Sequence, residues 1–151
     1  MIEGFKNVKT DKKLVIAGGS SDTDEFANQL KEMAKDDDRI IFTGFVQGQL
    51  LDELYSNAYI YSLPSDLEGM PLSLLEAMSY GKSIIGTDEA FQGIECDFSR
   101  IGAKCNTAEE FIKAIESLSD NLFNPYTYQV FSDKYETSTV ENRLKSFMTT
   151  F

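Results

Sequence analysis

Residues 64–81 read Pro-Ser-Asp-Leu-Glu-Gly-Met-Pro-Leu-Ser-Leu-Leu-Glu-Ala-Met-Ser-Tyr-Gly, and no other stretch of the chain is as informative. Its apolar second half predicts a helix from Pro71 to Tyr80. Proline suits the first helical position, because the N–H group that it lacks would have no intrahelical partner there. Gly81 is typical of the position at which a helix ends. Gly69 has no Cβ, so the backbone just before the helix can approach a ligand closely.

Two glutamates flank the start of this helix and indicate a binding site. The free N–H groups of the first turn lie at the positive end of the helix dipole, where phosphate binds readily. Glu68 precedes the helix, whereas Glu76 lies inside it among apolar neighbours, where a carboxylate is unusual unless something polar meets it. N–H groups for a pyrophosphate and two acceptors for hydroxyl groups suggest a nucleotide-sugar site. The alternative is a solvated Glu76, with Glu68 as an acidic loop residue favoured by the helix dipole.

Around this stretch, short β-rich runs alternate with helical patterns. This alternation predicts an α/β fold, a Rossmann-like and mainly parallel sheet with helices on both faces. The expected strands are 14–17, 40–43, 59–63, 82–87 and 102–105, and the expected helices begin near residues 22, 49, 71, 107, 126 and 138, with 88–100 as a loop. Apolar spacing should turn one face of each of the first two helices inward. Those faces carry Phe26, Leu30, Met33 and Ala34 in the first helix, and Leu50, Leu51, Leu54 and Tyr55 in the second.

Composition excludes several classes of function. The 151 residues suit one domain, and 25 acidic residues against 14 basic ones give a net charge of −11, which argues against a nucleic-acid partner. The chain has no histidine, so the commonest general base and transition-metal ligand are both missing. We interpret Asp36–Asp38 as a solvated loop, because three adjacent carboxylates cannot easily converge on one metal ion. Cys96 and Cys105 suit free thiols in a reducing compartment. No apolar run approaches the ~20 residues of a membrane-spanning helix.

Several segments together resemble one known family. The Glu-x7-Glu spacing runs into Ala-Met-Ser-Tyr-Gly-Lys at 77–82, with Leu-Val-Ile-Ala-Gly-Gly-Ser at 14–20, Ile-Ile-Phe-Thr-Gly-Phe-Val at 40–46 and Ser-Ile-Ile-Gly-Thr-Asp at 83–88. In this order they resemble the carboxy-terminal, donor-binding half of a retaining glycosyltransferase of the GT-B fold, family GT4. A nucleotide-sugar 2-epimerase half-domain shares the fold, but its pattern fits these segments less well.

The resemblance implies roles for particular residues. Glu76 would bind the ribose hydroxyls of a nucleoside diphosphate sugar and Glu68 the hydroxyls of its sugar, and we treat these two as the catalytic pair. The backbone at Phe45 and Val46 would meet the base. The expected donor-binding residues are Gly18, Gly19, Ser20, Phe45, Val46, Ser65, Gly69, Met70, Pro71 and Leu72. An ordinary strand-to-helix turn at 18–20, and simple packing at Phe45, are the alternatives. The family implies neither a metal nor a cofactor.

Parts of the family pattern are missing at the amino-terminal end. Residues 1–5 resemble the later part of the family's first helix, so the first strand, its Gly-Arg segment and a Lys-Gly pair are absent, as is the acceptor-binding domain. We therefore expect residues 1–151 to be one donor domain, truncated at its amino-terminal end, that is a fragment or a subunit of a split enzyme. The complete enzyme would transfer a hexose-type sugar to a saccharide or lipid-linked acceptor in polysaccharide biosynthesis. It would work in the cytoplasm, at the inner face of the membrane.

The missing cations favour a different class of function, a degenerate, non-catalytic donor domain that binds nucleotide or serves as an interaction subunit. The intact pair of Glu68 and Glu76 opposes it. The missing strand also has a structural consequence, because in the six-strand Rossmann order it is central, between the strands at 14–18 and 59–63. Its absence would leave two strand edges with unpaired N–H and C=O groups. We expect the flanking strands to close together or the chain to associate, for example as a homodimer, with association favoured.

Overall fold

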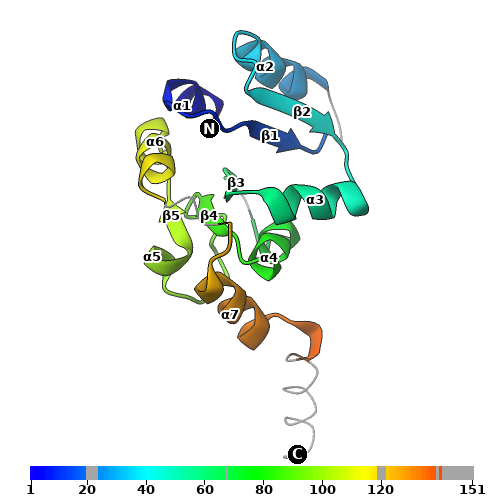
Figure 1. The fold of residues 1–151 in the computed structure, drawn as a ribbon, viewed down its shortest axis with the longest axis vertical. Coiled ribbons are helices and arrows are strands. Elements are labelled where there is room, and N and C mark those ends of the chain that lie inside the picture. Colours follow the sequence, from blue (N-terminus) through cyan, green and yellow to red (C-terminus); the bar gives the residue numbers. More distant parts are fainter. Residues whose placement is uncertain (20–23, 67, 119–121, 139, 141–151) are drawn as a thin grey trace, which may run out of the picture.

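The computed structural model describes residues 1–19, 24–66, 68–118, 122–138 and 140, and it has the expected Rossmann-like α/β architecture (Figure 1). The strands are β1 (Leu14–Ala17), β2 (Ile40–Gly44), β3 (Ile60–Leu63), β4 (Ser83–Gly86) and β5 (Gly102–Lys104). The helices are α1 (Ile2–Asn7), α2 (Asp24–Ala34), α3 (Gln49–Asn57), α4 (Leu72–Ser79), α5 (Phe98–Ile101), α6 (Ala108–Ser117) and α7 (Pro125–Lys134). Strands and helices alternate along most of the chain, as the sequence predicts. The short helix α5, within the expected loop, was not predicted.

The strands form two separate parallel sheets. β1 pairs with β2, in a register that places Leu14 opposite Ile40. β3, β4 and β5 form the second sheet, with β4 between the other two. Within the described residues, β1 and β3 each have one edge with no paired strand. The expectation that the flanking strands would close together is therefore wrong, because β1 remains in its own sheet (Figure 1).

Helix α4 has the local structure that its sequence predicts, with one shift at its start. Pro71 lies at the N-cap, with φ of −70°, one residue before the position expected for it. At the other end Gly81 has a φ of 62°, in the left-handed region that glycine adopts without strain. The Gly81 N–H donates to the Met78 carbonyl at 2.9 Å and the Lys82 N–H to the Ala77 carbonyl at 3.1 Å. These two bonds close the last turn of the helix and confirm the predicted stop.

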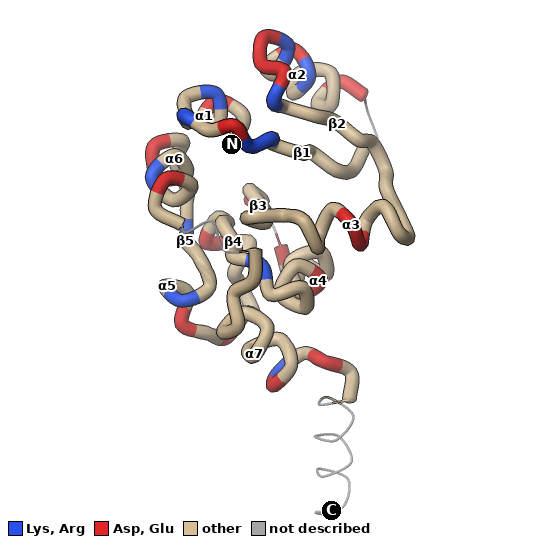
Figure 2. Tube along the Cα trace, in the orientation of Figure 1, with Lys and Arg blue, Asp and Glu red and all other residues tan. Residues whose placement is uncertain are grey.

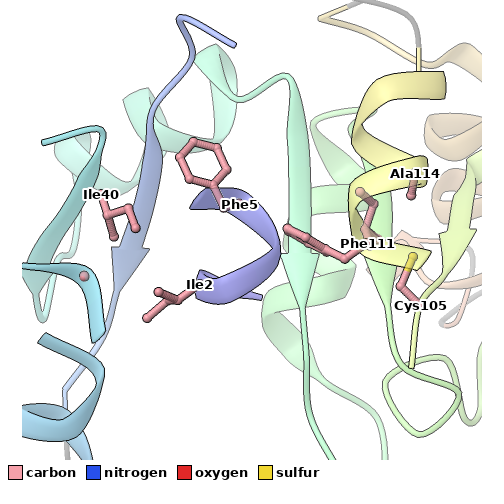
Figure 3. Packing of buried hydrophobic residues seen from close by; sticks show 8 residues of the cluster. Ile2, Phe5, Ile40, Cys105, Phe111 and Ala114 are labelled. Carbon is pink, nitrogen blue, oxygen red and sulfur yellow. The ribbon is translucent and has the colours of Figure 1, made fainter. Parts of the chain in front are cut away.

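The buried side chains form two clusters. One joins the two sheets through α1, whose Ile2 and Phe5 lie between Ile40 on one side and Phe111 of α6 on the other (Figure 3). The other lies under α4 and α7 against the three-stranded sheet, and contains Leu74, Met78, Ile84, Phe91, Ile94, Ile101 and Val130. Because this second cluster includes Leu74 and Met78 of α4, the inner face of that helix is fully packed.

The faces of α2 and α3 are less covered than their spacing predicts. Phe26 is 64% exposed, Met33 40% and Leu50 52%, although Ala34 and Tyr55 are buried as expected. These three side chains line the cavity beside β1, and none of the described strands pairs along that edge to cover them. Ser20, and most of the helix expected from residue 138, lie outside the described residues.

Candidate functional site

A cavity of about 1310 Å³ lies between β1 and β3. Strands β1 and β3 line it together with residues of α1, α2, α3, α4 and α6. The cavity brings together four of the residues that the sequence singles out, Gly18, Phe45, Val46 and Glu76. Lysines of the segment between α1 and β1 also line it, and Figure 2 shows this basic stretch just before β1.

The turn after β1 meets the end of β2 at the edge of this cavity. The Gly18 N–H donates to the Gly44 carbonyl at 2.8 Å, which ties the two carboxyl ends together. A Cβ at Gly19 would lie 2.6 Å from Cε2 of Phe45, so the aromatic ring occupies the space that a side chain there would need. Phe45 is nevertheless 75% exposed. An exposed ring at the end of parallel strands can stack on a planar group of a ligand.

The carboxylate of Glu76 is held by a hydrogen bond from another helix. Leu74, Ala77 and Met78 of α4 are fully buried, whereas Glu76 is exposed toward the cavity. The Tyr55 hydroxyl of α3 lies 2.9 Å from Oε2 of Glu76 and 3.2 Å from the Ser73 carbonyl. Burial raises the pKa of Tyr55, and the bond to Glu76 raises it further, so this hydroxyl stays protonated and can donate. Tyr55 is therefore the polar partner that the sequence leads us to expect for Glu76.

Two more tyrosines fix the position of Tyr55. The rings of Tyr55 and Tyr80 stack with centroids 5.4 Å apart, and the Tyr80 hydroxyl donates to Asp52 at 2.8 Å. The Tyr61 ring lies 5.9 Å from that of Tyr55, and its hydroxyl donates to Oγ of Ser73 at 2.8 Å. Sequence reasoning missed this cluster. The one available signal was that a tyrosine on a buried helix face needs a partner for its hydroxyl.

The loop that leads into α4 forms a second group of candidate residues outside the cavity lining. Glu68 is half-buried, Met70 and Leu72 are 50% and 73% exposed, and a Cβ at Gly69 would meet nothing within 4 Å. The Thr87 hydroxyl after β4 donates to the Ser65 carbonyl and accepts the Ala90 N–H. This contact anchors the loop beside β4.

Helix α4 has a free amino-terminal end next to that loop. Among the described residues no side chain caps it, since Pro71 at the N-cap has no group to do so. The first N–H groups of the helix are therefore available to an anion. Glu76 and Glu68 both act on Tyr61. Burial raises the pKa of the Tyr61 hydroxyl, and the negative charges of these two glutamates raise it further.

The cation nearest the motif has a structural role. Lys82 is only 3% exposed, and its Nζ donates to the carbonyls of Ser56 at 2.8 Å and Leu122 at 2.7 Å. Burial lowers the pKa of this lysine. Both hydrogen bonds bind Lys82 to the chain, so it is not aimed at a ligand.

The acidic run at 36–38 is tied to an arginine. Asp37 forms an ion pair with Arg39 at 2.7 Å, so one of the three carboxylates in this run is paired with a cation. Within the ranges that the structure describes, no three Asp, Glu, Cys or His side chains gather in a way that could hold a metal ion.

Cys96 and Cys105 are free thiols. None of the described helices is both long and apolar enough to cross a membrane.

A family model described as "Glycosyl transferases group 1" matches residues 1–121. Among curated proteins, the lipopolysaccharide 1,6-galactosyltransferase of Escherichia coli is 31% identical over 90 residues, which is 58% of this chain and 25% of that protein. The mannosylfructose-phosphate synthase of Agrobacterium fabrum is 30% identical over 97 residues, 58% of this chain and 21% of that protein. The chain spans a quarter or less of the length of the curated relatives it matches.

Solved structures share the fold at low identity. The Anabaena protein HepE in complex with UDP-glucose superimposes with a TM-score of 0.80 at 12% identity, over 99% of this chain and 44% of that one. The carboxy-terminal domain of the glycosyl transferase group 1 family protein LpcC from Francisella tularensis gives a TM-score of 0.73 at 22% identity, over 90% of this chain and 75% of that one. Both comparisons agree with the architecture described above.

Proposed function

Because the chain belongs to the family of glycosyl transferases group 1, we propose that it is the donor-binding half of a retaining, GT4-type glycosyltransferase. The complete enzyme would transfer a hexose-type sugar from a nucleoside diphosphate to a saccharide or lipid-linked acceptor, in polysaccharide biosynthesis. The observation that carries the proposal is the Glu76 carboxylate, held by Tyr55 at a cavity that also contains Gly18 and Phe45. The UDP-glucose complex of HepE, which has the same fold, supports a nucleotide-sugar ligand.

Each part of the donor has a place in this proposal. Ribose hydroxyls donate to Glu76, and the base lies against Phe45 and Val46. The diphosphate meets the free N–H groups at the start of α4, where Gly69 leaves room for close approach. These groups would stabilise the negative charge that develops on the departing diphosphate, as preorganised N–H donors do in other transferases and hydrolases. Glu68 receives hydroxyls of the donor sugar.

Other parts of the enzyme are assigned to polypeptide outside these 151 residues. They include the acceptor site and the cations that complete the binding of the diphosphate. The short share of the relatives' length that this chain spans supports the assignment. The isolated chain should therefore bind nucleotide without turnover. The proposal uses neither a bound metal nor an organic cofactor, and it places the activity in the cytoplasm at the inner membrane face, which suits free thiols.

Calorimetric titration of the chain with UDP, GDP and ADP tests the proposal, and Glu76→Gln is the decisive variant. A hydrogen bond to a charged group contributes about 1.5–3 kcal/mol, so the variant should weaken nucleotide binding by about tenfold to a hundredfold. Tyr55→Phe removes the donor that holds Glu76 and should weaken binding by a smaller factor. Glu109→Gln, on an exposed position of α6 outside the cavity lining, is the matched control and should leave affinity unchanged.

Two results would contradict the proposal. One is the absence of heat or NMR shifts near residues 68–76 at millimolar nucleotide, with the fold verified by circular dichroism. The other is a Glu76→Gln variant that binds as tightly as the Glu109→Gln control, which would make Glu76 a solvated helix residue. Sugar transfer by the isolated chain would overturn only the assignment of the acceptor site to other polypeptide.

A further inference from the structure

The segment between β4 and α5 lies against the loop that leads into α4. Near its start, the Thr87 hydroxyl donates to the Ser65 carbonyl. Further along, a Cβ at Gly93 would lie 3.2 Å from the Gly69 carbonyl oxygen and 3.9 Å from Cε of Met70. Gly93 also has a φ of 86°, which glycine adopts without strain. The segment and the loop therefore meet at two points, and the second leaves no room for a side chain.

The end of helix α7 holds the part of this segment that meets Gly69. Tyr135 directly follows the helix, and its hydroxyl accepts the Glu95 N–H at 3.1 Å and donates to the Gly93 carbonyl at 3.4 Å. Nζ of Lys134 donates to the Glu95 carbonyl at 2.8 Å and lies 3.3 Å from the carboxylate of the same residue. One end of α7 thus holds the backbone on both sides of residue 94.

The start of α7 holds the same segment closer to α5. The Tyr126 hydroxyl accepts the Asp97 N–H at 3.2 Å, and the guanidinium carbon of Arg100 lies 3.6 Å from the centre of the Tyr126 ring. Helix α7 itself packs beside α4, with Val130 and Leu74 in one buried cluster (Figure 1). The segment is therefore fixed to a helix that is firmly packed on α4.

These hydrogen bonds act where side-chain packing does not. Of residues 93–97, only Ile94 is buried, and Gly93, Glu95 and Asp97 are exposed. The three exposed residues are the ones whose backbone groups α7 and Tyr135 hold. Bonds to backbone groups fix the course of a chain whatever side chains it carries. The position of this segment beside Gly69 therefore depends on α7.

We propose that Tyr135 is a positioning residue for the donor. Its hydroxyl joins the Gly93 carbonyl to the Glu95 N–H, and so it holds the surface against which Gly69 lies. A binding loop keeps its geometry only when a second layer of residues supports it. Tyr135 supplies that support from outside the cavity lining.

This role rests on the proposed function, and it divides the ligand into two parts. In that function the diphosphate and the sugar lie at Gly69 and Glu68, whereas the base and the ribose lie at Phe45 and Glu76. Loss of the Tyr135 hydroxyl should therefore weaken the binding of a nucleoside diphosphate sugar and leave that of a nucleoside monophosphate unchanged. A general loss of stability would weaken both ligands alike, so the split between them identifies positioning.

Calorimetry with UDP-glucose and UMP measures this split. Tyr135→Phe removes only the hydroxyl and should raise the Kd of UDP-glucose about threefold to tenfold, with less than about a twofold change for UMP. Tyr128→Phe is the matched control, because it removes the same atom from an exposed tyrosine of the same helix, whose ring packs on Phe123. Its Kd values should match those of the unaltered chain. If GDP or ADP binds better than UDP, the corresponding glucose derivative and monophosphate take their place.

Two further measurements test the link between Tyr135 and the loop. In NMR spectra without ligand, the amide resonances of Glu95 and Gly69 should shift in Tyr135→Phe and stay in place in Tyr128→Phe. Gly93→Ala acts on the same contact, because its Cβ would press on the Gly69 carbonyl. This variant should weaken UDP-glucose by about tenfold or more and leave UMP unchanged. Should Gly93→Ala fail to fold, Tyr135→Phe still decides.

Three results would overturn the positioning role and leave the proposed function intact. The first is a Tyr135→Phe variant that binds UDP-glucose as tightly as the Tyr128→Phe control. The second is an equal loss for UDP-glucose and UMP, which would make Tyr135 a residue of general stability. The third is a Gly69 amide that does not shift in Tyr135→Phe. If no nucleotide or nucleotide sugar binds the unaltered chain, the proposed function itself fails, and the role of Tyr135 fails with it.

Discussion

The two sheets of the molecule differ in how completely they are buried. In the three-stranded sheet, β4 lies between two partners, and its Ile84 and Ile85 are 0% and 1% exposed. In the two-stranded sheet, Val15 is 39% exposed, and Phe26 on the adjoining helix α2 is 64% exposed. The same kinds of apolar residue therefore have different surroundings in the two halves. The difference shows that packing stabilises the half with α4, whereas the half with β1 is open along one side.

Polar contacts hold the more open half in place. Arg39, just before β2, donates to the carbonyls of Val8 at 2.9 Å and Thr10 at 3.1 Å. It also forms a two-pronged contact with Asp37, at 2.9 Å and 2.7 Å. These contacts fix the segment between α1 and β1 against the start of β2. Where burial is incomplete, hydrogen bonds of a planar cation position the chain.

The largest contrast should come from removing one methionine side chain from each half. Met78 of α4 is fully buried, and Met33 of α2 is 40% exposed. Met78→Ala leaves a cavity and should lower the free energy of unfolding by about 2–5 kcal/mol. Met33→Ala should change it by less than about 0.5 kcal/mol. Urea denaturation of both variants measures the difference, and equal losses would show that the two halves are packed alike.

A smaller contrast concerns two glycines with nearly the same positive φ, one in each half of the molecule. Gly81 has a φ of 62° and Gly44 a φ of 68°. Alanine is strained at a positive φ, by about 1–2 kcal/mol. At Gly81 its Cβ would also lie 2.4 Å from the ring of Phe123, whereas at Gly44 nothing lies within 4 Å.

Gly81→Ala should therefore be the more destabilising of the two in thermal unfolding, by roughly 1 kcal/mol, because Phe123 must move. The double variant Gly81→Ala with Phe123→Ala serves as the control. If it recovers none of the extra loss, the ring contact is not its cause.

The smallest effect is a dependence of stability on acid. The hydrogen bond from Arg39 lowers the pKa of Asp37 from 3.8 to about 2. Since the folded chain has the lower pKa, ionised Asp37 stabilises the fold above about pH 4, and this contribution is lost as the pH falls toward 2. The difference in unfolding free energy between the unaltered chain and Asp37→Asn should therefore shrink over that interval. Asp38→Asn, which removes an exposed carboxylate from the same segment, is the matched control. If the difference for Asp37→Asn stays constant with pH, the ion pair of Asp37 with Arg39 does not contribute to the stability of this half.

The sequence predicts well the features that depend on near neighbours. The helix expected from near residue 107 begins there with a capping box, in which Thr107 Oγ1 accepts the Glu110 N–H at 3.2 Å and the Glu110 carboxylate accepts the Thr107 N–H at 3.1 Å. The helix stop at Gly81 and the strands on either side of α4 were predicted for the same reason. Each of these follows from residues fewer than five positions apart.

Features that depend on distant residues could not be predicted in this way. The contact of Tyr55 with Glu76 spans 21 positions, and that of Arg39 with Val8 spans 31. Phe26 and Leu50 line the cavity but remain 64% and 52% exposed, since spacing shows which face is apolar but not whether anything covers it. The roles of Glu68, Gly69 and the other site residues stay predictions, which the nucleotide titrations address.

The tyrosine cluster also gives the protein a built-in optical signal. The chain has no tryptophan and seven tyrosines, so its ultraviolet emission comes from tyrosine alone. A hydroxyl that donates to a carboxylate emits weakly, because the excited phenol transfers its proton readily. Tyr55, bonded to Glu76, should therefore be among the dimmest of the seven. Any molecule that draws the carboxylate away would brighten it, so a fluorimeter can follow occupancy of this position without a label.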